Sequence, residues 1–290
     1  MHSAIGQRLR LSGGTELSFI TAGDASLPAV LLLHGFPGSA RTFREVVPEL
    51  SQAAYVIAPE LPGFGESDVL PAASFPAFGQ AISELLDRLA IGARYIYLHD
   101  FGAPVGFHIA MQAPERVLGL IVQNANAHRT GLGPPWTPVM DYWSHPNPEN
   151  EAAATAHLTF EGVRNGVIGG APPDVAARIP AESWEEDWRV MNLPGRMDTQ
   201  RALVRDYGNY VARFDEIATY LARWQPPSLM LWGRHDIFFD LAETLSWMRA
   251  LPRMEGHVFD AGHKLLETHA APAAALMTEF IKRTESAKRV

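Results

Sequence analysis

The sequence contains no cysteine and has a deficit of positive charge. Without cysteine there can be no disulfide, no thiolate metal ligand and no cysteine nucleophile. The 24 Lys and Arg residues are outnumbered by 32 Asp and Glu residues, which gives a formal net charge of −8. Because an acidic chain is repelled by phosphate backbones, we expect no nucleic-acid partner.

Long hydrophobic runs are also missing. The longest buried-type run, residues 29–33, has the length of a strand, whereas about 20 apolar residues are needed to cross a bilayer. The opening stretch MHSAIGQRLRL has no apolar core of the length found in signal peptides. Together with the lack of cysteine, which suits a reducing compartment, these features predict a cytoplasmic protein without a membrane partner.

Two kinds of cofactor motif are absent as well. No G-x-G-x-x-G pattern follows the first apolar run, and no cluster of His and Glu has the spacing of a metal site. We therefore expect neither an organic cofactor nor a metal.

What the sequence does contain is an alternation of short apolar runs with helical patterns. Its 290 residues, 47% of them apolar, are close to the upper limit for a single core. Apolar strands that alternate with helices predict an α/β protein whose mostly parallel sheet is flanked by helices, with ligands at the carboxyl ends of the strands. The runs span residues 29–33, 55–58, 95–98, 118–122, 228–232 and 256–259, after a hairpin over 7–11 and 16–21, and the clearest helical patterns span 76–89 and 102–111.

One interval breaks this alternation. Residues 128–224 contain no buried run, are rich in Trp, Tyr and Pro, and show helical patterns over 149–164, 181–191 and 198–222. We expect a core domain formed by residues 1–127 and 225–290, and an inserted helical cap domain over residues 128–224. Aromatic-rich helices inserted above the strand ends are typical of a lid.

The third apolar run leads through the sequence LHDFG (98–102) directly into a helical pattern. Where a strand runs through a sharp turn into a helix, the residue at the centre of the turn is presented above the sheet. The backbone N–H of the next residue points into the same space. That residue is usually Ser, but here it is Asp100, a carboxylate that is nucleophilic at neutral pH without a base. The pattern alone is weak evidence, because Asp is also common at helix starts.

The first run is followed by the sequence HGFPG (34–38). In this position the backbone N–H groups of Phe36 and Phe101 would point into the same site and form an oxyanion hole. A plain turn made of Gly and Pro is the alternative interpretation.

Two further polar residues follow late strands. Asp236 comes after the fifth run, and His263 comes 27 residues later, after the sixth. A carboxylate that orients an imidazole allows the imidazole to act as a base. The chain order Asp100, Asp236, His263 favours a joint role in catalysis over three unrelated structural roles.

These motifs, with residues 60–67 (ELPGFGES), resemble those of the α/β-hydrolase superfamily. Within it they are similar to the branch with an Asp nucleophile, which holds epoxide hydrolases and haloalkane dehalogenases. The absence of G-x-S-x-G disfavours serine esterases. The resemblance implies that Asp100 forms a covalent ester, which a water activated by His263 then hydrolyses. Leu98 departs from the small residue that the family usually has there, which would tighten or tilt the elbow, as the sharp turn around Asp100 is called.

The residue after Asp100 separates the two branches. Dehalogenases of this family usually carry Trp there, whose indole N–H binds the halide, or Arg in the fluoroacetate type, whereas Phe101 donates no comparable hydrogen bond. Epoxide hydrolases need acids above the epoxide oxygen, usually two lid tyrosines. Tyr207, within DYGN (206–209), best fits the family pattern Tyr-Arg-Asn, although Gly replaces the Arg, and Tyr142 is the candidate for the earlier tyrosine.

We therefore expect an epoxide hydrolase that converts a small apolar epoxide and water into a vicinal diol, as a monomer or homodimer. The expected catalytic residues are Asp100, Asp236, His263, Tyr207 and Tyr142, with Phe36 and Phe101 as the oxyanion hole.

Three alternatives remain open. A haloalkane dehalogenase could use a lid indole such as that of Trp136 or Trp143 for the halide. A non-catalytic small-molecule receptor could retain the same triad. Tyr207 also falls on an apolar helical face, so it could be plain packing. Styrene oxide turnover would separate enzyme from receptor, and halide release from a bromoalkane would separate the two enzymes.

Overall fold

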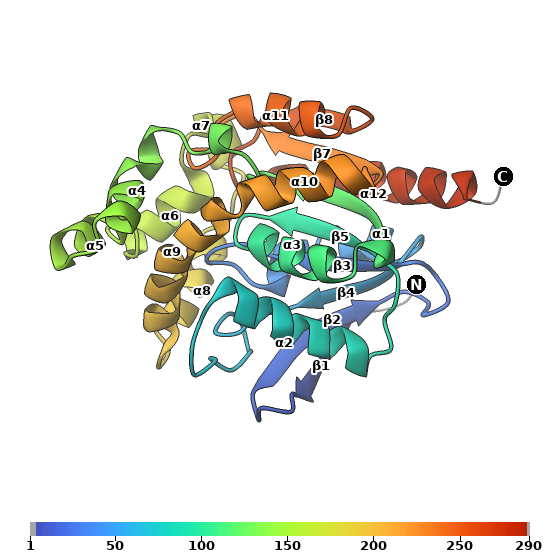
Figure 1. Ribbon diagram of the computed structural model, residues 1–290, viewed down its shortest axis with the longest axis horizontal. Helices are drawn as coiled ribbons and strands as arrows, with labels where there is room; N and C mark the ends of the chain where they lie inside the picture. The colour runs from blue at the N-terminus through green and yellow to red at the C-terminus, as the bar shows by residue number, and fades with distance from the viewer. Residues whose placement is uncertain (1–3, 289–290) are drawn as a thin grey trace.

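The computed structural model describes residues 4–288, and its strands form a single eight-stranded sheet in the order β1-β2-β4-β3-β5-β6-β7-β8 (Figure 1). The first two strands form a hairpin and pair antiparallel, as does β2 with β4, whereas all pairs from β3 to β8 are parallel. This mostly parallel sheet confirms the expected α/β-hydrolase fold. The strands are β1 (Ile5–Arg10), β2 (Glu16–Ala22), β3 (Ala29–Leu33), β4 (Tyr55–Pro59), β5 (Arg94–His99), β6 (Val117–Gln123), β7 (Ser228–Gly233) and β8 (Glu255–Phe259).

The central strands are buried on both faces because helices cover both. In β3, Leu31 and Leu33 join one hydrophobic cluster, while Val30 and Leu32 join the other. This is the two-residue period of a strand, and it explains why the run reads as continuously apolar. The first cluster lies under α2 (Phe75–Arg88), α3 (Gly102–Gln112), α10 (Phe214–Trp224) and α11 (Ala242–Ala250), and the second under α1 (Val47–Leu50) and α12 (Leu266–Ala287).

In residues 128–224, where the sequence has no buried run, all described elements are helices, apart from one isolated bridge between Leu132 and Phe239. Figure 1 shows α4, α5, α6 and α9 gathered at one end of the sheet, whereas α10 lies along the sheet beside α3 and α11. The elements before α10 are η3 (Arg129–Gly131), η4 (Pro134–Trp136), α4 (Thr137–Ser144), α5 (Pro148–Ala154), α6 (Phe160–Ile168), α7 (Pro173–Ala176), α8 (Glu182–Met191) and α9 (Arg196–Ala212).

Two helices expected in this interval are each divided in two. The pattern over 149–164 becomes α5 and α6, because the Thr159 side chain caps a new helix by accepting from the Gly162 N–H. The pattern over 198–222 is divided at Arg213 into α9 and α10. The apolar residues around Tyr207 therefore lie on two successive helices, and both helices contribute to the first hydrophobic cluster.

The remaining elements are the short helices η1 (Ala40–Phe43) and η2 (Pro114–Arg116). Between residues 4 and 288, no helix combines the length and the apolarity that a bilayer crossing needs.

Candidate active site

The turn between β5 and α3 holds Asp100 in an unusual backbone conformation. Its φ of +48° lies in the left-handed region, which Asp tolerates better than most residues. The carboxylate is buried, 7% exposed, and lies against the loop after β3. A Cβ on Gly35 would come within 2.4 Å of the Asp100 Cβ, so only glycine permits this approach. The turn after β5 and the loop after β3 therefore pack closely together at Asp100.

The loop after β3 presents a backbone donor to this carboxylate. The Phe36 N–H donates to Asp100 Oδ1 at 2.6 Å. Behind it, His34 Nε2 accepts from the Leu61 N–H at 3.0 Å, so its Nδ1 donates to the Gly35 carbonyl at 3.0 Å. Burial lowers the pKa of His34 to about 3, so the ring stays neutral in this role. Phe101 follows Asp100 at the start of α3, with its ring 5.6 Å from that of Phe36.

The second carboxylate and the histidine meet beside Asp100. His263 Nδ1 lies 2.9 Å from Asp236 Oδ2, and His263 Nε2 lies 3.7 Å from Asp100 Oδ2. Asp236 Oδ2 also accepts from Asn124 Nδ2 at 2.8 Å, and Oδ1 accepts from the Phe238 N–H at 2.7 Å. The Asp236 carboxylate accepts a hydrogen bond from the His263 Nδ1–H, which leaves Nε2 as the basic nitrogen facing Asp100.

A cavity of about 340 Å³ lies above Asp100, between the core and the inserted helices. This size suits a small organic molecule. Most of its wall is apolar and comes from both parts of the chain, and Asp100 is the only Asp, Glu, Lys or Arg among its described lining residues. The lining residues are Phe36, Asp100, Phe101, Pro135, Trp136, Val139, His157, Asn165, Val204, Tyr207, Ile237 and Phe238.

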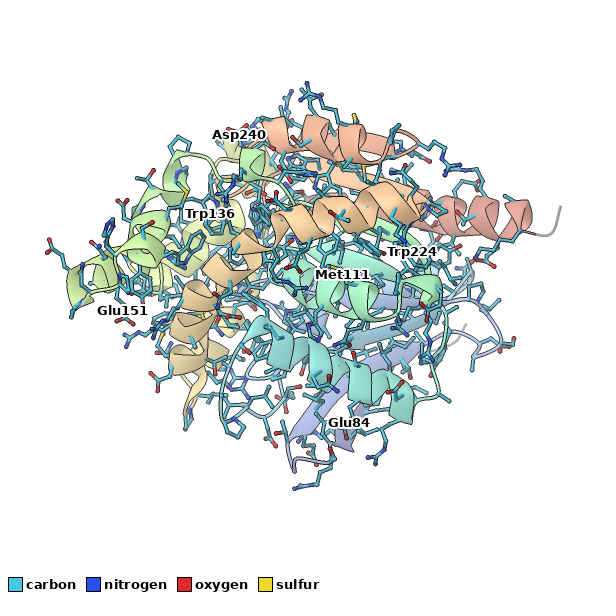
Figure 2. All side chains as sticks on the ribbon, in the orientation of Figure 1. Glu84, Met111, Trp136, Glu151, Trp224 and Asp240 are labelled. Atoms are coloured by element: carbon cyan, nitrogen blue, oxygen red, sulfur yellow. The ribbon has the colours of Figure 1, made fainter. Side chains whose placement is uncertain are left out.

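Tyr207 of α9 forms part of this wall, and Trp136, labelled in Figure 2, packs against it with ring centroids 4.8 Å apart. The Tyr207 hydroxyl donates to Asn126 Oδ1, and burial raises the pKa of Tyr207 well above its usual range. The hydroxyl therefore stays protonated and can act as a donor.

Tyr142 does not line the cavity. It is buried in a separate small cluster with Ala154 and Val204, among α4, α5 and α9. The structure therefore brings Asp100, Asp236, His263 and Tyr207 together but places Tyr142 elsewhere, because α4 turns this side chain toward α5.

The two candidate lid indoles already have acceptors. Trp136 Nε1 donates to the Phe238 carbonyl at 2.6 Å, and Trp143 Nε1 donates to the Val204 carbonyl at 2.9 Å. Trp143 is also absent from the cavity lining.

Four polar residues at the site were not among the sequence-based candidates. His157, in the turn between α5 and α6, lines the cavity with its ring 5.6 Å from that of Phe36, and Asn165 of α6 lines it as well. Burial lowers the pKa of His157, so its ring is neutral at neutral pH. Asn124 supports Asp236, and Asn126 binds Tyr207.

Only two of these four carried a usable signal in the sequence. Asn124 and Asn126 directly follow β6, where polar residues of a parallel sheet converge. His157 was hidden, because the pattern over 149–164 looked like one continuous helix.

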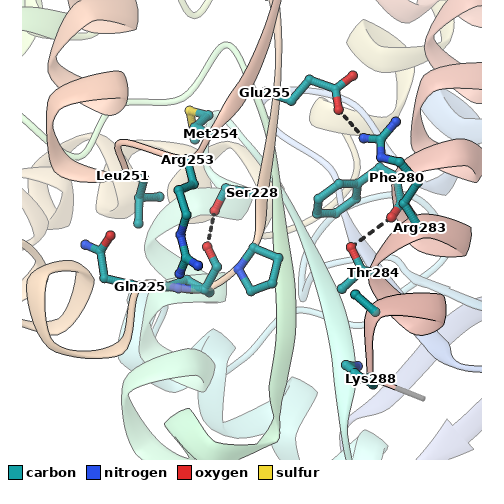
Figure 3. A pocket seen from close by; sticks show the side chains of 13 residues that line it. Gln225, Ser228, Leu251, Arg253, Met254, Glu255, Phe280, Arg283, Thr284 and Lys288 are labelled. Carbon is teal, nitrogen blue, oxygen red and sulfur yellow. Dashed lines mark hydrogen bonds and ion pairs between the residues drawn. The ribbon is translucent and has the colours of Figure 1, made fainter. Parts of the chain in front are cut away.

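A second cavity, of about 390 Å³, lies at the opposite edge of the sheet, at the starts of β7 and β8 and beside the end of α12 (Figure 3). Its polar groups mostly bind one another. Arg283 pairs with Glu255, the Ser228 hydroxyl donates to the Pro226 carbonyl, and the Thr284 hydroxyl donates to the Phe280 carbonyl. No group of three or more His, Asp or Glu side chains suited to a metal occurs within residues 4–288.

Comparisons with known proteins agree with this architecture. An uncharacterized hydrolase of Saccharomyces cerevisiae, YNR064C, is 31% identical over 272 residues, which cover 92% of this chain and 93% of that protein. An epoxide hydrolase of Caballeronia sordidicola is 27% identical over 89% of both chains. A haloalkane dehalogenase of Bradyrhizobium diazoefficiens is 31% identical over 109 residues, 37% of this chain and 35% of that enzyme.

The model of the alpha/beta hydrolase fold family matches residues 28–270, a span that includes the elbow, the inserted helices and the loops of Asp236 and His263. With the eight-stranded sheet and the yeast relative, this match shows that the chain belongs to the alpha/beta hydrolase family.

Proposed function

We propose that this hydrolase opens epoxides through an ester on Asp100. The observation that carries the proposal is that the two oxygens of this carboxylate have different partners. Oδ1 is bound by the Phe36 N–H at 2.6 Å, and Oδ2 lies 3.7 Å from His263 Nε2. Oδ2 is therefore the oxygen left to attack, and Oδ1 is already held where negative charge would later develop.

In the first step, Asp100 Oδ2 attacks one epoxide carbon and the carbon–oxygen bond of the ring breaks. The released alkoxide takes a proton from Tyr207. In the second step His263 removes a proton from water, and the hydroxide attacks the Asp100 carboxyl carbon, which places negative charge on Oδ1. Collapse expels the diol, which takes the proton from His263, and ionisation of Asp100 returns a proton to Tyr207.

The Asn126 carboxamide controls the Tyr207 proton in this scheme. The hydroxyl now donates to Asn126 Oδ1, while Nδ2 is buried without a hydrogen-bond partner among residues 4–288. Rotation of the carboxamide by half a turn would place Nδ2 on the Tyr207 oxygen. The Tyr207 proton would then be free for the epoxide oxygen, and no existing Nδ2 hydrogen bond would be lost. His157 also lines the cavity, but the one N–H of its neutral ring donates to the Ala154 carbonyl.

Three observations favour an epoxide over a haloalkane. The Phe101 side chain has no donor, the Trp136 indole N–H is already bound to the Phe238 carbonyl, and Trp143 is outside the cavity. A leaving halide would therefore lack the indole donors that the alternative needs. Since no Lys or Arg is among the described lining residues, substrates that carry a carboxylate are disfavoured too.

The inserted segment 128–224 is proposed as the cap on a core of residues 1–127 and 225–290. Trp136, His157 and Tyr207 come from this segment and line the cavity, which supports a role in closing the site. Its last helix, α10, packs beside the core helices α3 and α11.

Covalent trapping tests the proposal. His263→Gln should still consume about one equivalent of styrene oxide per site and then stall, because alkylation does not need the base. Intact-mass measurement should show one added epoxide, and peptide mapping should place it on the peptide that contains Asp100. Asp100→Ala is the control and should give neither adduct nor turnover.

The same experiment distinguishes the alternatives. With a bromoalkane, a dehalogenase would gain only the alkyl group and release bromide, whereas a receptor would gain nothing from either substrate. An adduct on another residue, or full turnover by Asp100→Ala, would overturn the mechanism.

A further inference from the structure

The residue after the candidate base, Lys264, has its ammonium group inside the protein. The side chain is buried, 6% exposed, and Nζ donates to the Phe36 carbonyl at 2.8 Å. Lysine is almost never buried to this extent unless it is paired, so the contact demands an explanation. Neither the elbow nor the pairing of Asp236 with His263 requires it.

The bond to Lys264 restrains Phe36 from its other side. The Phe36 N–H points to Asp100 Oδ1, and the carbonyl of the same residue points to Lys264. Since both groups belong to one residue, holding the carbonyl limits the rotation of the N–H away from Asp100.

The groups around Lys264 form a polar crevice between core and cap. It is lined from the core by Ser39, Arg41, Thr42, Lys264 and Glu267, and from the cap by Val167, Ser183 and Asp187. Glu267 is already held by Arg44, at 2.9 and 2.7 Å, and by the Ser183 hydroxyl at 2.8 Å.

Asp187 of α8 is therefore the cap carboxylate that remains to balance Lys264. Burial raises the pKa of Asp187 to about 6, and the positive charges of Lys264 and, to a smaller extent, Arg41 oppose that rise. A positive charge that attracts a carboxylate lowers the pKa of that carboxyl group, and this is the effect that Lys264 has on Asp187.

We infer that Lys264 is a positioning residue for the oxyanion hole, and that its counter-charge Asp187 makes this positioning depend on the docking of α8. The inference rests on the Asp100 ester chemistry proposed above. It names a route by which the cap would influence the second chemical step.

The two steps should respond differently to the loss of Lys264. Alkylation uses Asp100 Oδ2, which Phe36 does not touch. Hydrolysis of the ester develops charge on Oδ1, where the Phe36 N–H must be aligned. Losing the alignment should slow ester hydrolysis and leave alkylation nearly unchanged, so the ester should accumulate during turnover.

Rapid-quench intact-mass measurement of the ester fraction tests this with styrene oxide. In Lys264→Met, the rate of ester hydrolysis should fall by roughly 10- to 100-fold, which does not exceed the fall caused by removing a whole oxyanion donor. The rate of alkylation should change by less than about threefold. The double variant Lys264→Met/Asp187→Asn should show the same accumulation without leaving a buried acid uncompensated, which protects folding. Asp187→Asn alone should raise the ester fraction by a smaller amount.

Arg189→Met is the matched control. It breaks the ion pair with Glu186 on the same helix as Asp187, but Arg189 does not line the crevice, so the change should leave the ester fraction unchanged. A wild-type protein that forms no ester on Asp100 would overturn the proposed function and this inference together. A wild-type protein that forms and hydrolyses the ester, with Lys264 variants that hydrolyse it equally fast, would overturn this inference alone. An unchanged ester fraction in Asp187→Asn would overturn the link to the cap.

Discussion

At the scale of single residues, the choice of Asp over Ser at the elbow changes what its neighbours must do. A Ser nucleophile needs His263 to remove its proton, whereas an ionised Asp100 does not. The 3.7 Å between His263 Nε2 and Asp100 Oδ2 is longer than a hydrogen bond, which is consistent with a base that acts on water instead of on the nucleophile.

Tyr207 provides the sharpest test at this scale. Tyr207→Phe removes the donor proposed for the epoxide oxygen and keeps the ring that packs on Trp136. The kcat for styrene oxide should fall by roughly 10- to 100-fold, as expected for loss of an acid that acts in the transition state. The protein should still fold, with a melting temperature lowered by the loss of the hydrogen bond to Asn126. Steady-state kinetics and calorimetry on the same preparation measure both effects.

Tyr142→Phe is the matched control for Tyr207. Because Tyr142 packs against Ala154 and Val204 and does not itself line the cavity, this change should leave kcat within about twofold of wild type. If Tyr207→Phe also kept full activity, Tyr207 would have a packing role only and would not be the acid.

The sequence indicated Asp100, Asp236 and His263 because each follows a strand of the parallel part of the sheet, and the carboxyl ends of parallel strands lie at one edge. Their catalytic roles stay predictions. The positions of His157 in the cavity wall and of Tyr142 away from it depend on how the short inserted helices turn. A helical repeat in one segment does not specify which neighbouring helix its apolar face contacts.

At the scale of elements, the elbow accommodates a residue that the sequence marked as too large. Leu98 is fully buried at the end of β5, and a Cβ on Gly106 of α3 would lie 2.2 Å from Leu98 Cδ2. Glycine at 106 thus supplies the space that Leu98 fills, and α3 packs closely on the strand that carries Asp100. The sequence alone showed the large residue but not its partner on the next helix.

The helix α8 should make stability depend on pH through Asp187. The pKa of Asp187 is raised to about 6 in the native state, above the value of 3.8 for an exposed group. Between these values the native state holds more protons than the unfolded state, so the free energy of unfolding should fall as pH rises. Lys264 and Arg41 oppose this rise in pKa, and Glu267 and Glu186 add to it.

Asp187→Asn should remove this fall. Relative to wild type, the free energy of unfolding of the variant should increase by about 1–3 kcal/mol from pH 4 to pH 7, as measured by urea titration. Glu186→Gln is a control on the same helix, since a bond from Arg189 lowers the pKa of Glu186. Its effect should be small and of opposite sign. Parallel pH curves for wild type and Asp187→Asn would contradict the prediction.

At the scale of the whole molecule, the order of strands and helices follows from the alternation of apolar runs with amphipathic segments, which leaves few arrangements of a parallel sheet. The way the inserted helices sit on the core is set by long-range packing. Phe101, Phe107 and Phe75 of the core share one hydrophobic cluster with Leu203, Tyr207 and Tyr210 of α9. Such contacts join residues about a hundred positions apart, and no local pattern encodes them.

This shared cluster predicts that core and cap unfold together, although proteins of this size often unfold in stages. Far-UV circular dichroism and Trp fluorescence should give coincident urea transitions. Replacing the two fully buried core tryptophans, Trp232 and Trp247, with Phe leaves only fluorescence from residues 136–224, so that variant follows the inserted segment separately. Its fluorescence should still change at the same urea concentration as the circular dichroism of the same variant. An earlier fluorescence transition would mean that the contacts of Tyr207 and Tyr210 are too weak to couple the two parts, and that the cap opens as an independent unit above Asp100.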